Sequence, residues 1–141
     1  VTEATLRSLF GALYEQNVLI EGTILKASMV LPGKDCPEQV SVEEVAMATL
    51  RCLKASVPAN LPGIVFLSGG QSDEAATLHL NAMNQLGNKP WPLSFSYGRA
   101  MQQAALKTWA QDMVGNLAAA QSTVFDRARA NGLAALGQYK G

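Results

Sequence analysis

The stretch Gly22-Thr23-Ile24-Leu25-Lys26-Ala27-Ser28-Met29-Val30 has the pattern of a β-strand and carries a lysine at its centre. Alternation places Leu25 and Ala27 on an apolar face that suits packing against helices, and Lys26 on the opposite face. Lysine is seldom fully buried without a partner. A desolvated, neutral amine is a nucleophile that condenses with a ketone or aldehyde. Alternatively, Lys26 extends to water or closes a salt bridge in the core.

Two further strands are predicted, each followed by a glycine-containing turn. Residues 64–67 form a continuous apolar run, which is typical of a strand in a parallel sheet, and residues 91–96 form the third strand. Helices separate the strands, and a capping box at residues 41–44 marks the start of one of them. Strands that alternate with helices at this spacing predict an α/β fold with a parallel sheet.

Both turns have the composition of an anion site. After the second strand, Ser68, Gly69 and Gly70 leave backbone N–H groups free to face an anion, although a tight turn that needs glycine only for positive φ explains the pair equally well. After the third strand, Gly98 allows close approach and Arg99 offers a guanidinium that binds oxyanions through two nitrogens.

Composition excludes several classes of protein. The chain has 141 residues, is 48% hydrophobic and 16% charged, and balances 11 basic with 11 acidic side chains, which predicts a soluble globular domain with no nucleic-acid partner. No apolar run is long enough to cross a membrane and no signal layout is present, so the cytosol is the expected compartment. We expect Cys36 and Cys52 to be free thiols, with no zinc site.

The one histidine, His79, follows Leu78, which we assign to the buried stripe of its helix. No second base or ligand is evident beside it, so a surface or packing role is expected.

The order of the strands combines a lysine with two anion-competent turns at strand ends. In a β/α barrel those ends meet at the active-site face, where phosphate is commonly bound. These features predict a Schiff-base enzyme that acts on a phosphorylated carbonyl compound.

Nearly the whole chain resembles the C-terminal part of class I fructose-bisphosphate aldolase. The similarity is carried by five motifs: Glu21-Gly22-Thr23-Ile24-Leu25-Lys26, Met29-Val30 with Pro32-Gly33, Phe66-Leu67-Ser68-Gly69-Gly70-Gln71-Ser72, Leu80-Asn81-Ala82-Met83-Asn84, and Phe95-Ser96-Tyr97-Gly98-Arg99-Ala100. The resemblance implies a TIM (β/α)8 barrel, of which these residues supply the last three β/α units and a C-terminal helix.

The resemblance also implies roles for individual residues. Lys26 matches the lysine that forms the Schiff base with the C2 ketone of fructose 1,6-bisphosphate or dihydroxyacetone phosphate. The residues that match phosphate-binding positions are Ser68, Gly69 and Gly70 in the first turn, and Ser96, Gly98 and Arg99 in the second. The expected protein is a cytoplasmic, homotetrameric glycolytic lyase that cleaves fructose 1,6-bisphosphate to dihydroxyacetone phosphate and glyceraldehyde 3-phosphate. It requires no cofactor and no metal.

Two departures from the family pattern qualify these expectations. Ala27-Ser28 stands where the family usually has Pro-Asn. Three strands cannot close a barrel, which has eight. Residues 1–141 are therefore expected to be the C-terminal portion of a single barrel domain, with the N-terminal portion and its acid/base residues absent and negligible activity for this piece alone.

Two alternatives remain open at this point. One is a non-catalytic scaffold of the aldolase fold that binds protein partners such as actin. The other is a different Schiff-base barrel enzyme, such as a transaldolase or a deoxy-sugar aldolase.

Overall fold

The computed structural model describes residues 1–33 and 35–141. The elements follow one another in the order α1 (Thr2–Glu15), the 3-10 helix η1 (Ile20–Gly22), β1 (Leu25–Ala27), α2 (Val42–Ser56), β2 (Ile64–Phe66), α3 (Asp73–Gln85), β3 (Leu93–Phe95), α4 (Arg99–Gln111) and α5 (Leu117–Ala135). Three strand–helix units follow an initial helix and precede a final one, as the sequence predicts. In the predicted loop at residues 31–37, Lys34 lies outside the described residues.

The sheet is parallel, with strand order β1-β2-β3. Each strand has three residues, fewer than the sequence pattern predicts. Single backbone hydrogen bonds extend the pairing by one residue, from Leu67 N to Ala27 O (3.0 Å) and from Ser96 N to Phe66 O (2.8 Å). The paired region ends soon after these bonds, where the chain turns toward a helix, so the strands are shorter than the runs that look like strand in the sequence.

The two faces of the sheet differ in what covers them. Register aligns Ala27 with Phe66, and both side chains are buried among the helices, at 9% and 0% exposure. Register also aligns Lys26 with Val65 and Val65 with Ser94 on the other face, where Lys26 is exposed. One face therefore forms the core, and the other, which we call the open face (Lys26, Val65 and Ser94), is not covered by the helices.

Side-chain caps fix the starts of α2 and α3. Ser41 Oγ accepts from Glu44 N (3.2 Å) and Glu44 Oε2 accepts from Ser41 N (2.8 Å), which confirms the predicted capping box. Ser72 Oγ accepts from Ala75 N (3.1 Å) at the start of α3. These bonds satisfy N–H groups that have no partner within the helix.

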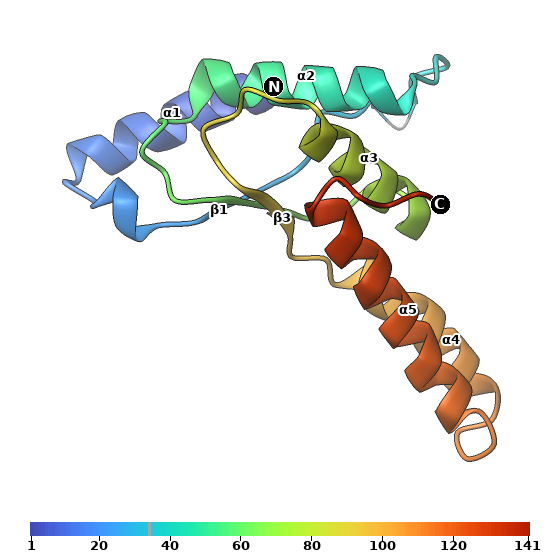
Figure 1. The fold of residues 1–141 in the computed structure, drawn as a ribbon. Helices are drawn as coiled ribbons and strands as arrows, with labels where there is room; N and C mark the ends of the chain where they lie inside the picture. Colours follow the sequence, from blue (N-terminus) through green and yellow to red (C-terminus); the bar gives the residue numbers. More distant parts are fainter. Residues whose placement is uncertain (34) are drawn as a thin grey trace.

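Figure 1 shows α1 and α2 along one side of the sheet, and α4 and α5 side by side, extending away from the strands. α5 returns toward α3, where Asn84 Nδ2 donates to Leu93 O (3.2 Å) and to Ala134 O (3.1 Å). One amide thus joins α3, β3 and α5. Over the part of the chain that the structure describes, no helix has the length and apolar character needed to cross a membrane.

Candidate functional site

Lys26 is the central residue of β1 and lies on the open face. Its side chain is exposed, and among the described residues no carboxylate lies within the 4.0 Å limit of a salt bridge to its ammonium group. The described residues therefore supply no salt bridge for Lys26, and its exposure agrees with the alternative that the side chain extends to water. Lys26 is also not desolvated by these residues, because nothing among them covers the open face.

The turn between β2 and α3 (residues 67–72) contains Ser68, Gly69 and Gly70. Ser68 is buried, at 4% exposure. Gly70 has φ +78°, so the fold itself favours glycine there, whereas a Cβ at Gly69 would meet only the end of the Leu67 side chain, at 3.1 Å from Cδ1. Within the described chain, the N–H groups of Gly69 and Gly70 donate to no backbone acceptor. The two interpretations of this turn are thus compatible, because a turn that needs glycine also presents unpaired N–H groups.

The turn between β3 and α4 (residues 96–98) differs from the first. Gly98 is the N-cap residue of α4 and has φ −90°, a value open to any residue. A Cβ built at Gly98 meets nothing within 4 Å. Backbone strain therefore does not explain the glycine here. The explanation that remains is that a residue without a side chain lets an anion approach closely. Ser96, just before it, is exposed.

Arg99 joins the two turns. It is the first residue of α4, and its Nη2 donates to Ser68 O (3.0 Å) and to Gln71 O. Nη1 lies 3.5 Å from Asp73 Oδ1. The guanidinium thus sits against the β2–α3 turn and holds two of its carbonyl groups.

The parallel register brings these features to one edge of the sheet. β2 lies between β1 and β3, so the β2–α3 turn is flanked on one side by the strand of Lys26 and on the other by the turn of Arg99. An exposed amine, unpaired backbone N–H groups and a guanidinium therefore meet at the carboxyl ends of parallel strands. That set of groups can bind an anion and can offer a nucleophile to a carbonyl group.

Tyr97 is a positioning residue that the sequence analysis missed. It lies between Ser96 and Gly98, is 7% exposed, and donates from its hydroxyl to Ala76 O on α3 (2.8 Å). Its ring centroid is 5.4 Å from that of Phe95, and burial raises the pKa of Tyr97 well above its usual range. The available signal was an aromatic residue between a serine and a glycine where a strand ends.

Gln71 and His79 form a buried polar pair that was also missed. His79 is 7% exposed, whereas Leu78 is half-buried, so the assignment of Leu78 to the buried stripe is wrong by one position. His79 Nδ1 and Gln71 Oε1 are 2.6 Å apart, and burial lowers the pKa of His79. Gln71 Nε2 is buried without a partner in the part of the chain described.

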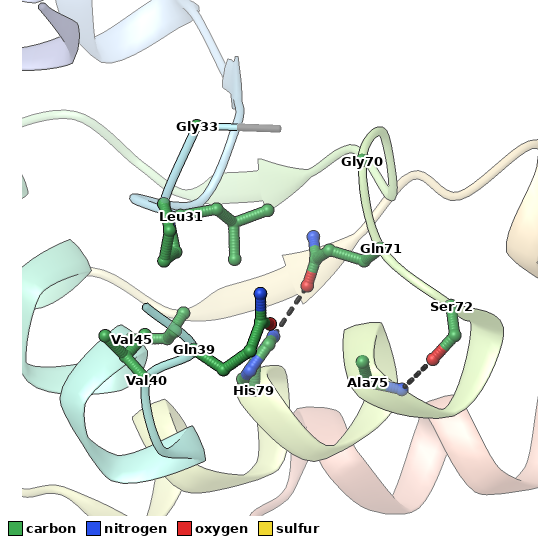
Figure 2. A pocket seen from close by; sticks show the side chains of 11 residues that line it. Leu31, Gly33, Gln39, Val40, Val45, Gly70, Gln71, Ser72, Ala75 and His79 are labelled. Atoms are coloured by element: carbon green, nitrogen blue, oxygen red, sulfur yellow. Dashed lines mark hydrogen bonds between the residues drawn. The ribbon is translucent and has the colours of Figure 1, made fainter. Parts of the chain in front are cut away.

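This pair lines a cavity of about 430 Å³. Figure 2 shows its walls: the connection that contains Leu31 and Val40 on one side, and the β2–α3 turn with α3 on the other. The Gln71 oxygen points at His79. The described residues that line the cavity include Gly70 but not Lys26 or Arg99, so the cavity adjoins the β2–α3 turn without containing the amine.

The fold and the site define a parallel β/α protein with an amine on the open face of its sheet and two anion-competent turns at the strand ends. The whole chain, residues 1–141, matches the family model for fructose-bisphosphate aldolase class-I. The chain therefore belongs to the class I fructose-bisphosphate aldolase family, which confirms the resemblance seen in the sequence.

Individual relatives agree with this assignment. The chain is 74% identical over 141 residues to a probable fructose-bisphosphate aldolase class 1 of Xanthomonas axonopodis pv. citri (strain 306), covering 100% of this chain and 42% of that protein. It is 53% identical to fructose-bisphosphate aldolase 1 of Toxoplasma gondii, covering 100% of this chain and 39% of that one. The chain thus spans about two-fifths of the length of these relatives.

A solved structure supports the fold. Fructose-bisphosphate aldolase from Plasmodium falciparum, in a ternary crystal structure with TRAP and a small-molecule inhibitor, superposes with a TM-score of 0.94 at 47% identity. The match covers 99% of this chain and 40% of that chain. The predicted fold class, an α/β aldolase fold of which this chain supplies a part, is confirmed.

Proposed function

We propose that this chain supplies the Schiff-base lysine and the phosphate-binding turns of a class I fructose-bisphosphate aldolase. The reaction is the reversible cleavage of fructose 1,6-bisphosphate to dihydroxyacetone phosphate and glyceraldehyde 3-phosphate. One observation carries the proposal: Lys26 lies exposed on the open face, one strand away from a turn whose N–H groups are unpaired. Membership in the family supplies the reaction class.

In this mechanism Lys26 Nζ attacks the C2 ketone to give a carbinolamine, and the C2 oxygen leaves as water as the C=N bond forms. The protonated imine accepts the electrons of the C3–C4 bond, so C3 becomes part of an enamine while the C4 hydroxyl loses its proton and becomes the aldehyde product. Protonation of C3 and hydrolysis of the imine then release dihydroxyacetone phosphate and restore the amine. The imine makes the carbanion accessible by spreading its charge onto nitrogen.

The two turns would hold the phosphates. Ser68, Gly69 and Gly70 are proposed to bind the ketose phosphate through backbone N–H groups, and Ser96, Gly98 and Arg99 to form the second phosphate-binding turn. Fixing the phosphate uses binding energy from a remote part of the substrate to hold C2 against the amine. Arg99 already contacts the first turn through Ser68 O, so both turns can act on one ligand.

We further infer that residues 1–141 form the C-terminal portion of a barrel domain. The sheet formed by the described residues has β1 and β3 at its edges, and unpaired strand edges need a cover. Earlier strands would supply that cover, together with the base that takes the proton from the C4 hydroxyl and the desolvation of Lys26 that these residues lack. A cytoplasmic location and a homotetramer are further predictions from the resemblance.

The test is to trap the imine. The protein is incubated with dihydroxyacetone phosphate, reduced with borohydride, and analysed by intact mass and peptide mapping. A stable adduct on the peptide that contains Lys26 is expected, with none after Lys26→Met. Lys107→Met is the matched control, because Lys107 is an exposed lysine on α4. An adduct that persists in Lys26→Met, or no adduct on a full-length polypeptide, would overturn the proposal.

A further inference from the structure

One guanidinium on α5 spans the starts of two other helices. Arg127 Nη2 donates to Asp73 O (2.6 Å), the carbonyl of the first residue of α3, and Arg127 Nε donates to Ala100 O (3.1 Å), the second residue of α4. α3 begins directly after the β2–α3 turn and α4 directly after the β3–α4 turn. One guanidinium thus bridges the two helix starts that follow the two turns.

The side chains around Arg127 hold it in one orientation. Thr77 Oγ1 accepts from Arg127 Nη2 (2.7 Å) and donates to Asn131 Oδ1 (2.7 Å), and Asn131 Nδ2 reaches Met101 Sδ (3.1 Å) on α4. Thr77 and Asn131 are both 0% exposed. Leaving a buried polar group unpaired is costly, so these bonds restrict the guanidinium. We call Arg127, Thr77 and Asn131 the Arg127 network.

The geometry requires an arginine. Two donors on different nitrogens of a planar fork reach two carbonyls on different helices, whereas a lysine carries its donors on one nitrogen. Both carbonyls lie in first helical turns, next to the groups proposed to bind phosphate. Nε and Nη2 of Arg127 donate to acceptors at the two helix starts and on Thr77, so we assign Arg127 an effect on the site through the turns.

Arg99 completes the arrangement from the other side. It reaches from the start of α4 to Ser68 O and Gln71 O in the first turn, while Arg127 reaches from α5 to both helix starts. The two turns are therefore joined at two points, and α5 carries one of them. Packing of the helices needs only contacts along their lengths. The bonds of Arg99 and Arg127 instead converge on the helix ends that face the site.

We propose that Arg127 is a positioning residue for phosphate binding: it holds the two phosphate-binding turns at the spacing at which one sugar phosphate reaches both the turns and Lys26. This inference rests on the proposed function. It predicts that loss of Arg127 weakens binding of the substrate's phosphate group more than it slows imine formation by the Lys26 amine.

The experiment compares borohydride trapping at Lys26 by dihydroxyacetone phosphate and by dihydroxyacetone, which lacks the phosphate, in the full-length protein. For Arg127→Gln we expect subsaturating trapping by the phosphate ester to fall about tenfold, and trapping by dihydroxyacetone to stay within about twofold of wild type. Inorganic phosphate should also compete less well. Arg129→Gln is the matched control, since Arg129 is an exposed arginine on the same helix, and it should leave both rates unchanged.

A second variant keeps the test informative if Arg127→Gln does not fold. Arg127→Lys keeps the charge but not the two-nitrogen span, so the ratio of the two trapping rates should fall in it as well, even if Arg127→Gln yields too little folded protein. Equal loss with both ketones would show that Arg127 serves stability alone and would overturn the inference, as would no loss with either. Failure of wild-type protein to be trapped at Lys26 would instead overturn the proposed function.

Discussion

Replacing Gly98 by alanine is expected to weaken phosphate binding while leaving the protein folded. Gly98 has φ −90° and a Cβ there would meet nothing within 4 Å, so the methyl group fits without strain. Reduced entropy of the unfolded chain favours the variant by roughly 0.4–1 kcal/mol, and the poorer N-cap preference of alanine offsets this. The net change in the free energy of unfolding should be about 0.5 kcal/mol or less.

Gly70 provides the contrasting variant. Its φ of +78° lies in the left-handed region, and the nearest atom to an added Cβ, Leu31 Cδ1, is 3.9 Å away. Gly70→Ala therefore costs backbone strain and not a clash, about 1–2 kcal/mol.

Gly98→Ala, in contrast, should lower the affinity for inorganic phosphate about tenfold, the equivalent of about 1.4 kcal/mol, because its methyl group enters the space where the anion would approach.

Both variants are measured by urea unfolding and by competition of inorganic phosphate against dihydroxyacetone phosphate in the trapping assay. A change in midpoint at constant m value reports stability. Gly87→Ala is the control, since an added Cβ there also meets nothing within 4 Å and the residue follows the far end of α3. Wild-type phosphate affinity in Gly98→Ala, or wild-type stability in Gly70→Ala, would refute the reasoning.

Three further changes test the surroundings of the site. Tyr97→Phe removes the hydrogen bond to Ala76 O (2.8 Å) but keeps the ring, so it should cost about 1 kcal/mol by urea unfolding; no loss would mean that the hydroxyl does not hold the turn. Burial lowers the pKa of His79, so the unfolded chain takes up the proton first. The contribution of His79 to stability should be constant above about pH 6.5 and fall below it by at most about 1.4 kcal/mol per pH unit, and His79→Gln should flatten that part of the profile. Asp73→Asn removes a carboxylate 3.5 Å from Arg99 Nη1 and should tighten inorganic phosphate about two- to fivefold in low salt; weaker binding would show that the carboxylate orients the guanidinium.

Sequence patterns between residues only a few positions apart predicted most of the fold. Strand alternation about Lys26 predicted which face of β1 packs on the helices, and the burial of Ala27 and Met29, at 9% and 3% exposure, confirms it. The capping box at Ser41 was read from residues three positions apart, and its hydrogen bonds are present. Both features depend on neighbours in the chain, which is why the sequence alone reveals them.

The contacts that position the turns depend on the tertiary fold and were not predicted. Arg127 lies 54 residues from Asp73, and nothing in its helical neighbourhood marks it as different from Arg129. Likewise, His79 is buried against a partner, Gln71, that lies 8 residues away across a turn. The roles of Lys26 and of the two turns in catalysis stay predictions.

The division of the sheet into a packed face and an open face separates two kinds of evolutionary constraint. Ile64 and Phe66, at 1% and 0% exposure, lie on the packed face, where a change of volume is penalised as a loss of stability. Lys26, Val65 and Ser94 alternate with such positions along the strands. Substitutions there leave the packing against the helices unchanged, so in a saturation mutagenesis experiment the loss of stability that comes from disturbed helix packing should alternate with a period of two along each strand.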